Sequence, residues 1–329
     1  MQEFVIVTIL KIFIVLAVFG FLAAFTTYIE RKILAYFQRR LGPSNVGPFG
    51  ILQLLADGIK LFTKEDFVPA NANKVIFLIA PLITVSTAFI AMSAVPYFGS
   101  FEIFGYKINP IISDINIAVL FVLAVASVGH YGALLAGMSS ANKWGLLGAA
   151  RTTIQLLSYE VVSGLSLIAP IMLIGSFSLI DINNYQEGSI LNWLIFSQPL
   201  AFILFMLSGF AQTNRTPFDL LEHEAELVSG YVTEYSGLRW GMFFIGEYAN
   251  LYTISFLIAL IFLGGFNPLW IIPGGLAIVL KVMFLIFVFL WARATLPHIR
   301  PDQLMWLSWK ILMPLAVINI LLTGFIVMI

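Results

Sequence analysis

The chain has 329 residues, of which 60% are hydrophobic and only 10% are charged, with 17 basic and 17 acidic side chains. Soluble domains carry about 25% charged residues, so this composition and a mean hydropathy of +0.98 exclude a soluble domain and predict an all-α polytopic membrane protein, built as a single membrane domain. The absence of cysteine excludes disulfides and an iron–sulfur cluster bound by this chain.

Runs of about 20 mostly apolar residues, the length that crosses a hydrocarbon core of about 30 Å, predict transmembrane helices. The first run is too long for a signal peptide and lacks a small-residue cleavage site, so we expect it to be a span. The eight predicted spans are 4–29, 75–96, 115–138, 154–174, 193–213, 240–263, 274–294 and 308–328.

The loop after the first span contains a predicted amphipathic helix over residues 50–64. Polar side chains recur on one helical face and apolar side chains on the other, and the segment is too short to span a membrane, so we expect it to lie in the interface. Two Gly-Pro pairs precede it and punctuate a turn. The helix either seals the bundle or forms the floor of a pocket at the level of the lipid headgroups.

The distribution of Lys and Arg predicts the orientation. The loops after the first, third, fifth and seventh spans, with their helix ends, hold 14 of the 17 basic residues. We therefore expect these loops to face the cytoplasm, and both termini to lie outside the cell's inner (plasma) membrane.

Two acidic residues lie inside predicted spans. Glu160 is nine residues beyond Arg151, and Glu247 is eight beyond Arg239, so both acids are expected at similar depth in the cytoplasmic half. A charge there costs at least about 2.5 kcal/mol, and such residues usually face a bundle interior, water or a partner. Each carboxyl is either protonated and merely hydrogen-bonded between helices, or part of a functional cluster.

The cytoplasmic loop 214–238 concentrates further carboxylates, and its stretch 216–235 contains no Lys or Arg. Clustered carboxylates raise one another's pKa and titrate as a group, which suits a proton relay, although a solvated acidic surface is the simpler alternative. Apolar residues threaded through the loop, among them Phe218, argue against full exposure. The acids are Asp219, Glu222, Glu224, Glu226 and Glu234.

Only one of the three histidines, His130, lies inside a predicted span. A transmembrane haem held by two histidines needs His pairs within helices, so we expect no haem on this chain.

Five blocks resemble, in order, the NuoH family of respiratory complex I, also called the NADH dehydrogenase subunit 1 family. They are ERKILAYFQRRLGPSNVGPFGILQLLADGIKLFTKE, QLLSYEVV, NRTPFDLLEHEAELVSGYVTEY, GEYANL and RATLPHIRPDQLMWLSWKILMPL. The resemblance implies a membrane subunit of a proton-pumping NADH-quinone oxidoreductase that forms the membrane side of a quinone chamber, where ubiquinone or menaquinone is the substrate.

Further expectations follow from the resemblance. Electrons arrive from an iron–sulfur subunit, and other partners are the hydrophilic quinone-site subunits, small membrane subunits leading to the pumping subunits, and lipid; no nucleic acid is expected. Glu160, Glu247 and the loop acids correspond to the family's proton-coupling acids. The residues implied at the quinone site are Arg31, Arg40, Asp57, Lys60, Arg215, Phe218 and Arg293.

The chain departs from the family pattern at four positions, namely Leu221, His223, His298 and Pro301. These put in question the local loop shape and the pKa of the acids near His223. The arginines are also open to a simpler interpretation, as anchors that set the orientation.

Three other functions compete with this interpretation. A stand-alone ion transporter would use the acids as a path, but we find no internal repeat of the transporter kind. The membrane anchor of a proton-pumping hydrogenase or formate hydrogenlyase would share the fold and the acids. A purely structural anchor would leave the buried acids unexplained.

Overall fold

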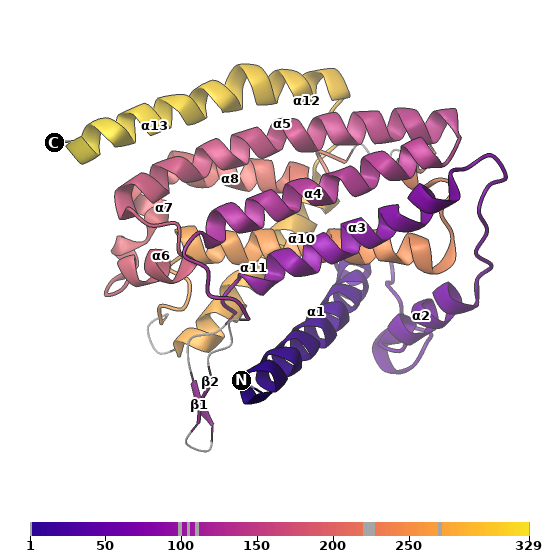
Figure 1. Ribbon diagram of the computed structural model, residues 1–329, viewed down its shortest axis with the longest axis horizontal. Coiled ribbons are helices and arrows are strands. Elements are labelled where there is room, and N and C mark those ends of the chain that lie inside the picture. The colour runs from indigo at the N-terminus through magenta and orange to yellow at the C-terminus, as the bar shows by residue number, and fades with distance from the viewer. Residues whose placement is uncertain are drawn as a thin grey trace.

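A computed structural model describes residues 2–97, 101–103, 106–108, 112–219, 228–268 and 272–328. Long helices run side by side along the longest axis of the molecule, with α3, α4 and α5 forming adjacent rods and α13 lying along α5 (Figure 1). The helices are α1 (Gln2–Phe37), α2 (Gln53–Thr63), α3 (Lys74–Ser93), α4 (Ala118–Ser139), α5 (Lys143–Ile174), α6 (Leu179–Tyr185), α7 (Leu194–Ser197), α8 (Pro199–Gln212), α10 (Gly237–Phe262), α11 (Gly274–Thr295), α12 (Pro301–Leu307) and α13 (Met313–Met328).

Seven helices in the described ranges are long and apolar enough to cross a membrane, with α12 and α13 counted as one helix, joined through the π-helical turn Ser308–Leu312. Of these, α10 is the central one, because 78% of its most apolar stretch is buried inside the protein, against 11% for α1. The spans predicted at 75–96, 240–263 and 274–294 match α3, α10 and α11 closely.

The predicted eighth crossing is not confirmed, because the segment expected as one helix over 193–213 is broken. It forms the four-residue α7 and the 14-residue α8, and at 1.5 Å per residue α8 is only about 21 Å long. The break lies at Gln198, whose φ of −133° and ψ of 56° are not helical. Pro199 explains it, since proline lacks an N–H and disfavours helical geometry in the preceding residue.

Two spans extend beyond their predicted ends on the side where the basic residues gather. Helix α1 continues to Phe37 rather than ending near 29, and α5 begins at Lys143 rather than near 154. Hydropathy marks only the part of a helix that contacts hydrocarbon, whereas the backbone hydrogen bonds continue into the polar region.

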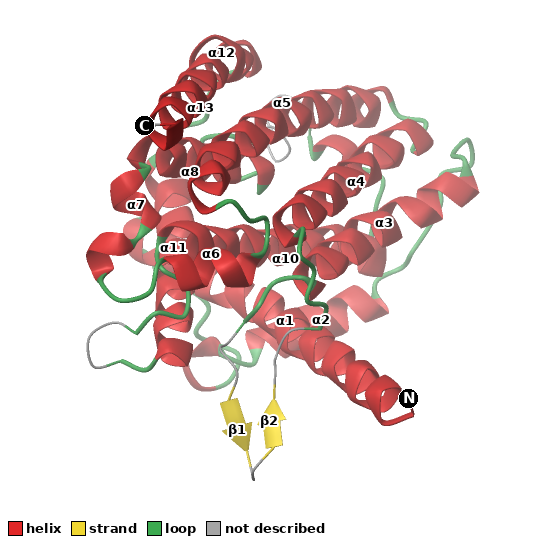
Figure 2. Ribbon diagram, turned by 60° about the vertical axis from the view of Figure 1, so that its left-hand side comes forward, coloured by secondary structure: helices red, strands yellow, loops and turns green. Residues whose placement is uncertain are grey.

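A short antiparallel hairpin interrupts the otherwise helical pattern between α3 and α4. Strand β1 (Phe101–Ile103) pairs with β2 (Tyr106–Ile108), and the register sets Glu102 opposite Lys107. The hairpin projects from the bundle (Figure 2). The sequence-based expectation of an all-α chain did not include it.

Helix α2 is a separate helix within the range expected for the amphipathic segment. It lies to one side of the bundle in Figure 1, and its side chains Leu55, Ile59 and Phe62 are between 63% and 74% exposed. The turn that precedes it depends on Gly50, which has a φ of 80°, and a Cβ there would meet the carbonyl oxygen of Pro43 at 2.1 Å. That α2 lies in a membrane interface stays a prediction.

Helices α3 and α4 pack closely enough that one position requires glycine. A Cβ at Gly132 would meet Thr84 Oγ1 at 2.2 Å and the carbonyl oxygen of Ala80 at 3.0 Å. This close approach holds the middle of α4 against α3, and with it the neighbouring His130, which is 7% exposed.

Candidate functional site

A buried cluster of charges joins α1, α10, α11 and the turn after α8. Glu30 on α1 is 4% exposed and accepts hydrogen bonds from three side chains. Arg215 Nη1 donates to both carboxylate oxygens at 2.8 Å, Tyr248 Oη donates to Oε2 at 2.6 Å, and Arg293 Nη1 donates to Oε1. We call these four residues the Glu30 cluster.

Each member of the Glu30 cluster is placed by a different element. Glu30 lies in the extension of α1 beyond its predicted end, Tyr248 on the central helix α10, and Arg293 in the last turn of α11. Arg215 follows α8 in a turn where Asn214 has a φ of 48°, a left-handed conformation that asparagine tolerates. The guanidinium of Arg215 also stacks over the Tyr248 ring, 4.5 Å from its centroid.

The electrostatics of Arg215 connect the cluster to a predicted coupling acid. Burial lowers the pKa of Arg215, but the negative charges of Glu30 and Glu247 and the contact with Tyr248 outweigh burial, so the pKa is raised above its ordinary value. Arg215 therefore stays charged while 2% exposed. Because Glu247 lies within electrostatic range of Arg215, the cluster brings together two predicted quinone-site arginines and one predicted proton-coupling acid.

The predicted residues of the first cytoplasmic loop gather at a second place, where α2 meets the end of α1. Arg31 Nη1 donates to Asp57 Oδ2 at 2.7 Å, Gln53 Nε2 donates to Asp57 Oδ1 at 2.9 Å, and Lys60 Nζ lies 4.0 Å from Asp57 Oδ1. The Arg31 and Asp57 side chains are 48% and 29% exposed, so this contact is partly solvated.

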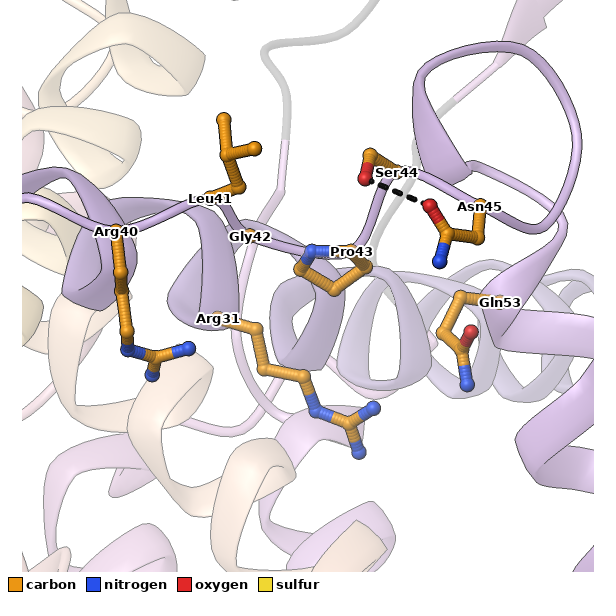
Figure 3. Close-up of a pocket in the computed structure, with 8 residues that line it drawn as sticks. All are labelled: Arg31, Arg40, Leu41, Gly42, Pro43, Ser44, Asn45 and Gln53. Carbon is orange, nitrogen blue, oxygen red and sulfur yellow. Dashed lines mark hydrogen bonds between the residues drawn. The ribbon is translucent and has the colours of Figure 1, made fainter.

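An open pocket of about 550 Å³ adjoins these residues, lined by Arg31, Arg40, Gln53 and the turn from Leu41 to Asn45. Figure 3 shows the Arg31 and Arg40 side chains on one side of the turn, with Leu41 pointing to the other. Leu41 is 89% exposed. The pocket therefore combines two guanidinium groups with an exposed apolar edge.

The second predicted coupling acid, Glu160, pairs with a histidine inside the bundle. His130 Nδ1 on α4 lies 3.3 Å from Glu160 Oε2 on α5, and the two side chains are 8% and 18% exposed. The sequence drew attention to His130 only as the one histidine inside a predicted span, and its pairing with Glu160 was not predicted.

The remaining predicted residues are spread along the loop that connects α8 and α10. Asp219 is 3% exposed, and Phe218 is buried at 2% with its ring 5.3 Å from that of Tyr159. Glu234 accepts a hydrogen bond from Asn142 Nδ2 at 2.7 Å, at the turn between α4 and α5. Glu222, Glu224 and Glu226 lie outside the described residues.

The sequence did not reveal two members of the Glu30 cluster, Glu30 and Tyr248. Glu30 precedes Arg31 and Lys32 and falls one residue beyond the predicted span, where hydropathy does not distinguish a buried acid from a charge in the polar region. A useful signal was the position of Glu30 itself. An acid beside basic residues at the end of an apolar helix suggests that its carboxylate pairs with a cation inside the bundle.

Within the residues that the structure describes, no three His, Cys, Asp or Glu side chains form a group suited to a metal ion. The charged groups that come together in the described residues are arginine–carboxylate pairs, the Lys60–Asp57 pair and the His130–Glu160 pair, which can bind anions and exchange protons.

The fold and these sites define a class: a multi-pass helical membrane protein with buried ion pairs at one end of the bundle. Residues 10–324 match the family model described as NADH dehydrogenase, and the chain belongs to this family. It is 67% identical over 326 residues to the H subunit of the NADH-quinone oxidoreductase of Wolinella succinogenes, covering 99% of both chains.

Other relatives carry the same description. The protein from Nitratiruptor sp. is 67% identical over 98% of both chains, and that from Helicobacter acinonychis is 61% identical over 100% of both chains. The resemblance to the NuoH family of complex I is therefore confirmed, and the chain is a subunit of an enzyme complex of this kind.

Proposed function

We propose that the chain forms the membrane side of the quinone chamber in a proton-pumping NADH-quinone oxidoreductase and couples quinone reduction to proton translocation. The observation that carries the proposal is the Glu30 cluster, in which two arginines and a carboxylate are held inside the protein with Glu247 in electrostatic range. The description shared by the relatives supports a quinone enzyme over a hydrogenase anchor.

The physical basis is that an anionic form of the quinone competes with the carboxylates of the protein for the same guanidinium groups. Reduction of a quinone passes through anionic forms, and an anion near Arg215 or Arg293 would weaken their hold on Glu30 and Glu247. A carboxylate that loses a cationic partner in a buried site gains proton affinity. Quinone chemistry and proton uptake then share a coupling free energy that acts in both directions.

The other predicted residues complete this scheme. Arg31 and Arg40 line a pocket whose exposed apolar edge suits a quinone entering from the membrane, and Asp57 and Lys60 lie beside it through the contact of Asp57 with Arg31. Phe218 stays a predicted quinone contact. Protons pass between Glu160, Glu247 and the loop acids, which are Asp219, Glu222, Glu224, Glu226 and Glu234.

We propose eight crossings of the inner membrane, with α7 and α8 together making the fifth, both termini outside and α2 in the cytoplasmic interface. Hydrophilic iron–sulfur and quinone-site subunits then cover the basic face, and small membrane subunits or lipid cover the exposed apolar helices. In Figure 1 the C-terminus lies at the end of the bundle far from α2, and α1 runs from the N-terminus toward the side of α2, which agrees with this topology.

The test is to tag this chain, isolate the native assembly, identify its subunits and assay quinone reduction. Iron–sulfur subunits and inhibitor-sensitive quinone reduction are expected. A nickel-containing partner with hydrogen evolution would favour the hydrogenase anchor instead, and the chain alone with ion transport would favour a transporter.

The coupling acids are tested in the same assembly. Glu160→Gln and Glu247→Gln remove the proton-carrying group but keep a similar shape, so the assembly is expected to form while proton-coupled turnover falls. Glu65→Gln, at an exposed carboxylate in the first cytoplasmic loop, is the control. Normal pumping in an assembled variant would remove that acid from the path.

A further inference from the structure

Between the two buried acids lies a small cavity enclosed by α3, α4, α8 and α10. Its volume is about 20 Å³, and its polar lining consists of His130, Gln212, Asn250 and Thr253, with apolar side chains such as Phe205 and Leu257 around them. About 10–15 Å³ is enough for one water molecule when polar partners are present. The cavity therefore has the size and lining of a site for a single water within the membrane-spanning bundle.

The cavity is connected to Glu160 in two ways. His130 lines it and also places Nδ1 3.3 Å from Glu160 Oε2. Gln212, on the opposite wall, donates from Nε2 to Ser163 Oγ at 2.7 Å, and Ser163 Oγ donates to the carbonyl oxygen of Glu160 at 2.9 Å. The cavity wall thus adjoins the side chain of Glu160 and is hydrogen-bonded to the turn of α5 that carries it.

The cavity also lies along the helix face that carries Glu247. Asn250 is three residues after Glu247 on α10, and Ile254 and Leu257, which line the cavity too, are seven and ten residues after it. Residues at these spacings share one face of a helix. One wall of the cavity therefore belongs to the face of α10 that carries Glu247, whose charge interacts with Arg215. Another wall belongs to His130, which is paired with Glu160.

The hydrogen bonding of His130 points to Glu160 as the partner of its Nδ1 atom. Nδ1 is buried, and among the described residues no group is aligned to form a hydrogen bond with it, even though Glu160 is within ion-pair distance. Buried ring nitrogens in native proteins almost always have a partner. A small movement of Glu160 supplies one, which leaves the other ring nitrogen for a water in the cavity.

We propose that His130 and a water molecule in this cavity carry protons between the face of Glu247 and Glu160. This inference rests on the proposed function, which it extends by one relay residue and one water site. Imidazole suits the task because it has two ring nitrogens and an ordinary pKa near neutrality.

The proton balance is simple. A proton leaves Nδ1 of the imidazolium for a carboxylate oxygen of Glu160, which becomes neutral. The ring keeps its Nε2 proton, which returns to Nδ1 by tautomer exchange, and Nε2 then accepts a proton from the water. The water is itself replenished from the side of Glu247.

The charged side chains on the helices packed around His130 are few. The carboxylates are Glu160 on α5 and Glu247 on α10, and α8 has no charged residue. The cations of α3, α5 and α10 precede the two acids along their helices or lie at a helix start, and they are Lys74, Lys143, Arg151 and Arg239. The two acids are therefore the groups with which His130 can exchange a proton.

The sharpest test is His130→Asn in the intact assembly. The amide nitrogen of Asn stands near the position of Nδ1 and keeps a donor to Glu160, but an amide does not carry protons at neutral pH. We expect normal assembly, an unchanged KM for quinone and proton-coupled turnover lowered at least about tenfold. The pH profile should lose the inflection due to the histidine. Tyr131→Phe, at the next and half-exposed position of α4, is the control.

A second test does not depend on whether the His130→Asn variant assembles normally. His130→Ala enlarges the cavity by the volume of the ring, and added imidazole is expected to restore turnover with a pH dependence set by the added base. Asn250→Leu, which replaces a polar wall by an apolar one, is expected to lower turnover as His130→Asn does.

The outcomes separate the two proposals. Wild-type turnover in His130→Asn, or a loss in His130→Ala that imidazole does not restore, would assign His130 to packing and overturn the relay. If Glu160→Gln in the same experiment lowers turnover, the proposed function still stands. If the wild-type assembly reduces no quinone, the proposed function itself fails.

Discussion

Glu30 is the residue on which the candidate site depends most directly, because it receives both arginines and Tyr248. Removing one partner from a buried ion pair leaves the other charge without compensation, which costs about 3–5 kcal/mol. We therefore expect Glu30→Gln to lower the thermal denaturation midpoint of the purified assembly and to weaken quinone reduction.

The matched comparison is the double variant Glu30→Gln with Arg293→Gln, which removes one charge of each sign. Residues in direct contact are not additive and couple by about 0.5–3 kcal/mol, so the double variant is expected to be more stable than the sum of the two single effects. Simple additivity would indicate that another anion already neutralises Arg293.

Single-residue contacts were the least predictable part of the molecule. Depth along predicted helices puts Glu160 and Glu247 in the cytoplasmic half of their spans, because depth follows from helical rise alone, and this depth stays a prediction. The partners could not be predicted in this way. Arg215, Tyr248 and Arg293 are 185, 218 and 263 residues from Glu30 in sequence, and only helix packing decides which of them meet.

Among the structural elements, the turn before α2 is the most constrained by backbone geometry. Gly50→Ala places a methyl group 2.1 Å from the Pro43 carbonyl oxygen at a φ of 80°, so the turn must rearrange. We expect a raised KM for quinone and faster proteolytic cleavage within residues 42–50.

Gly58→Ala is the control for this change. Gly58 lies in α2 with nothing within 4 Å of a built Cβ, and alanine favours a helix by about 0.5–1 kcal/mol over glycine. It is expected to leave KM unchanged. Equal kinetic effects of both substitutions would mean that α2 itself, not the turn, shapes the pocket.

The attachment of α2 to α1 is expected to matter for binding more than for stability. The Arg31–Asp57 pair is partly solvated, and such pairs contribute about 0.2–1 kcal/mol. Asp57→Asn is therefore expected to leave the denaturation midpoint nearly unchanged but to raise the KM for quinone, measured in vesicles. Lys60→Ala, which removes a contact at 4.0 Å, should have the smaller effect; the reverse order would contradict the assignment of Asp57.

Elements were predicted well where hydropathy alone determines them, as for α3, α10 and α11. The prediction failed where local backbone chemistry intervened, since Pro199 divides an apolar run that hydropathy counts as continuous. It also missed the polar extensions of α1 and α5, since a hydropathy window ends where hydrocarbon contact ends.

At the scale of the whole molecule, the orientation can be tested directly because the chain has no cysteine. Glu187 and Lys143 are both exposed, in the loops following the fourth and third predicted spans. A membrane-impermeant maleimide added to intact cells is expected to label Glu187→Cys but not Lys143→Cys, and to label both after permeabilisation. The opposite pattern would reverse the proposed topology.

The sequence separations within the Glu30 cluster also constrain how the protein is made. Ribosomes add about 5–20 residues per second, so Arg293 is synthesised on the order of ten seconds or more after Glu30. During that interval α1 carries an acid at its inner end whose cationic partners do not yet exist. All partners of the acid are present only once α11 has been made, so the Glu30 cluster closes late in synthesis, with α12 and α13 still to follow.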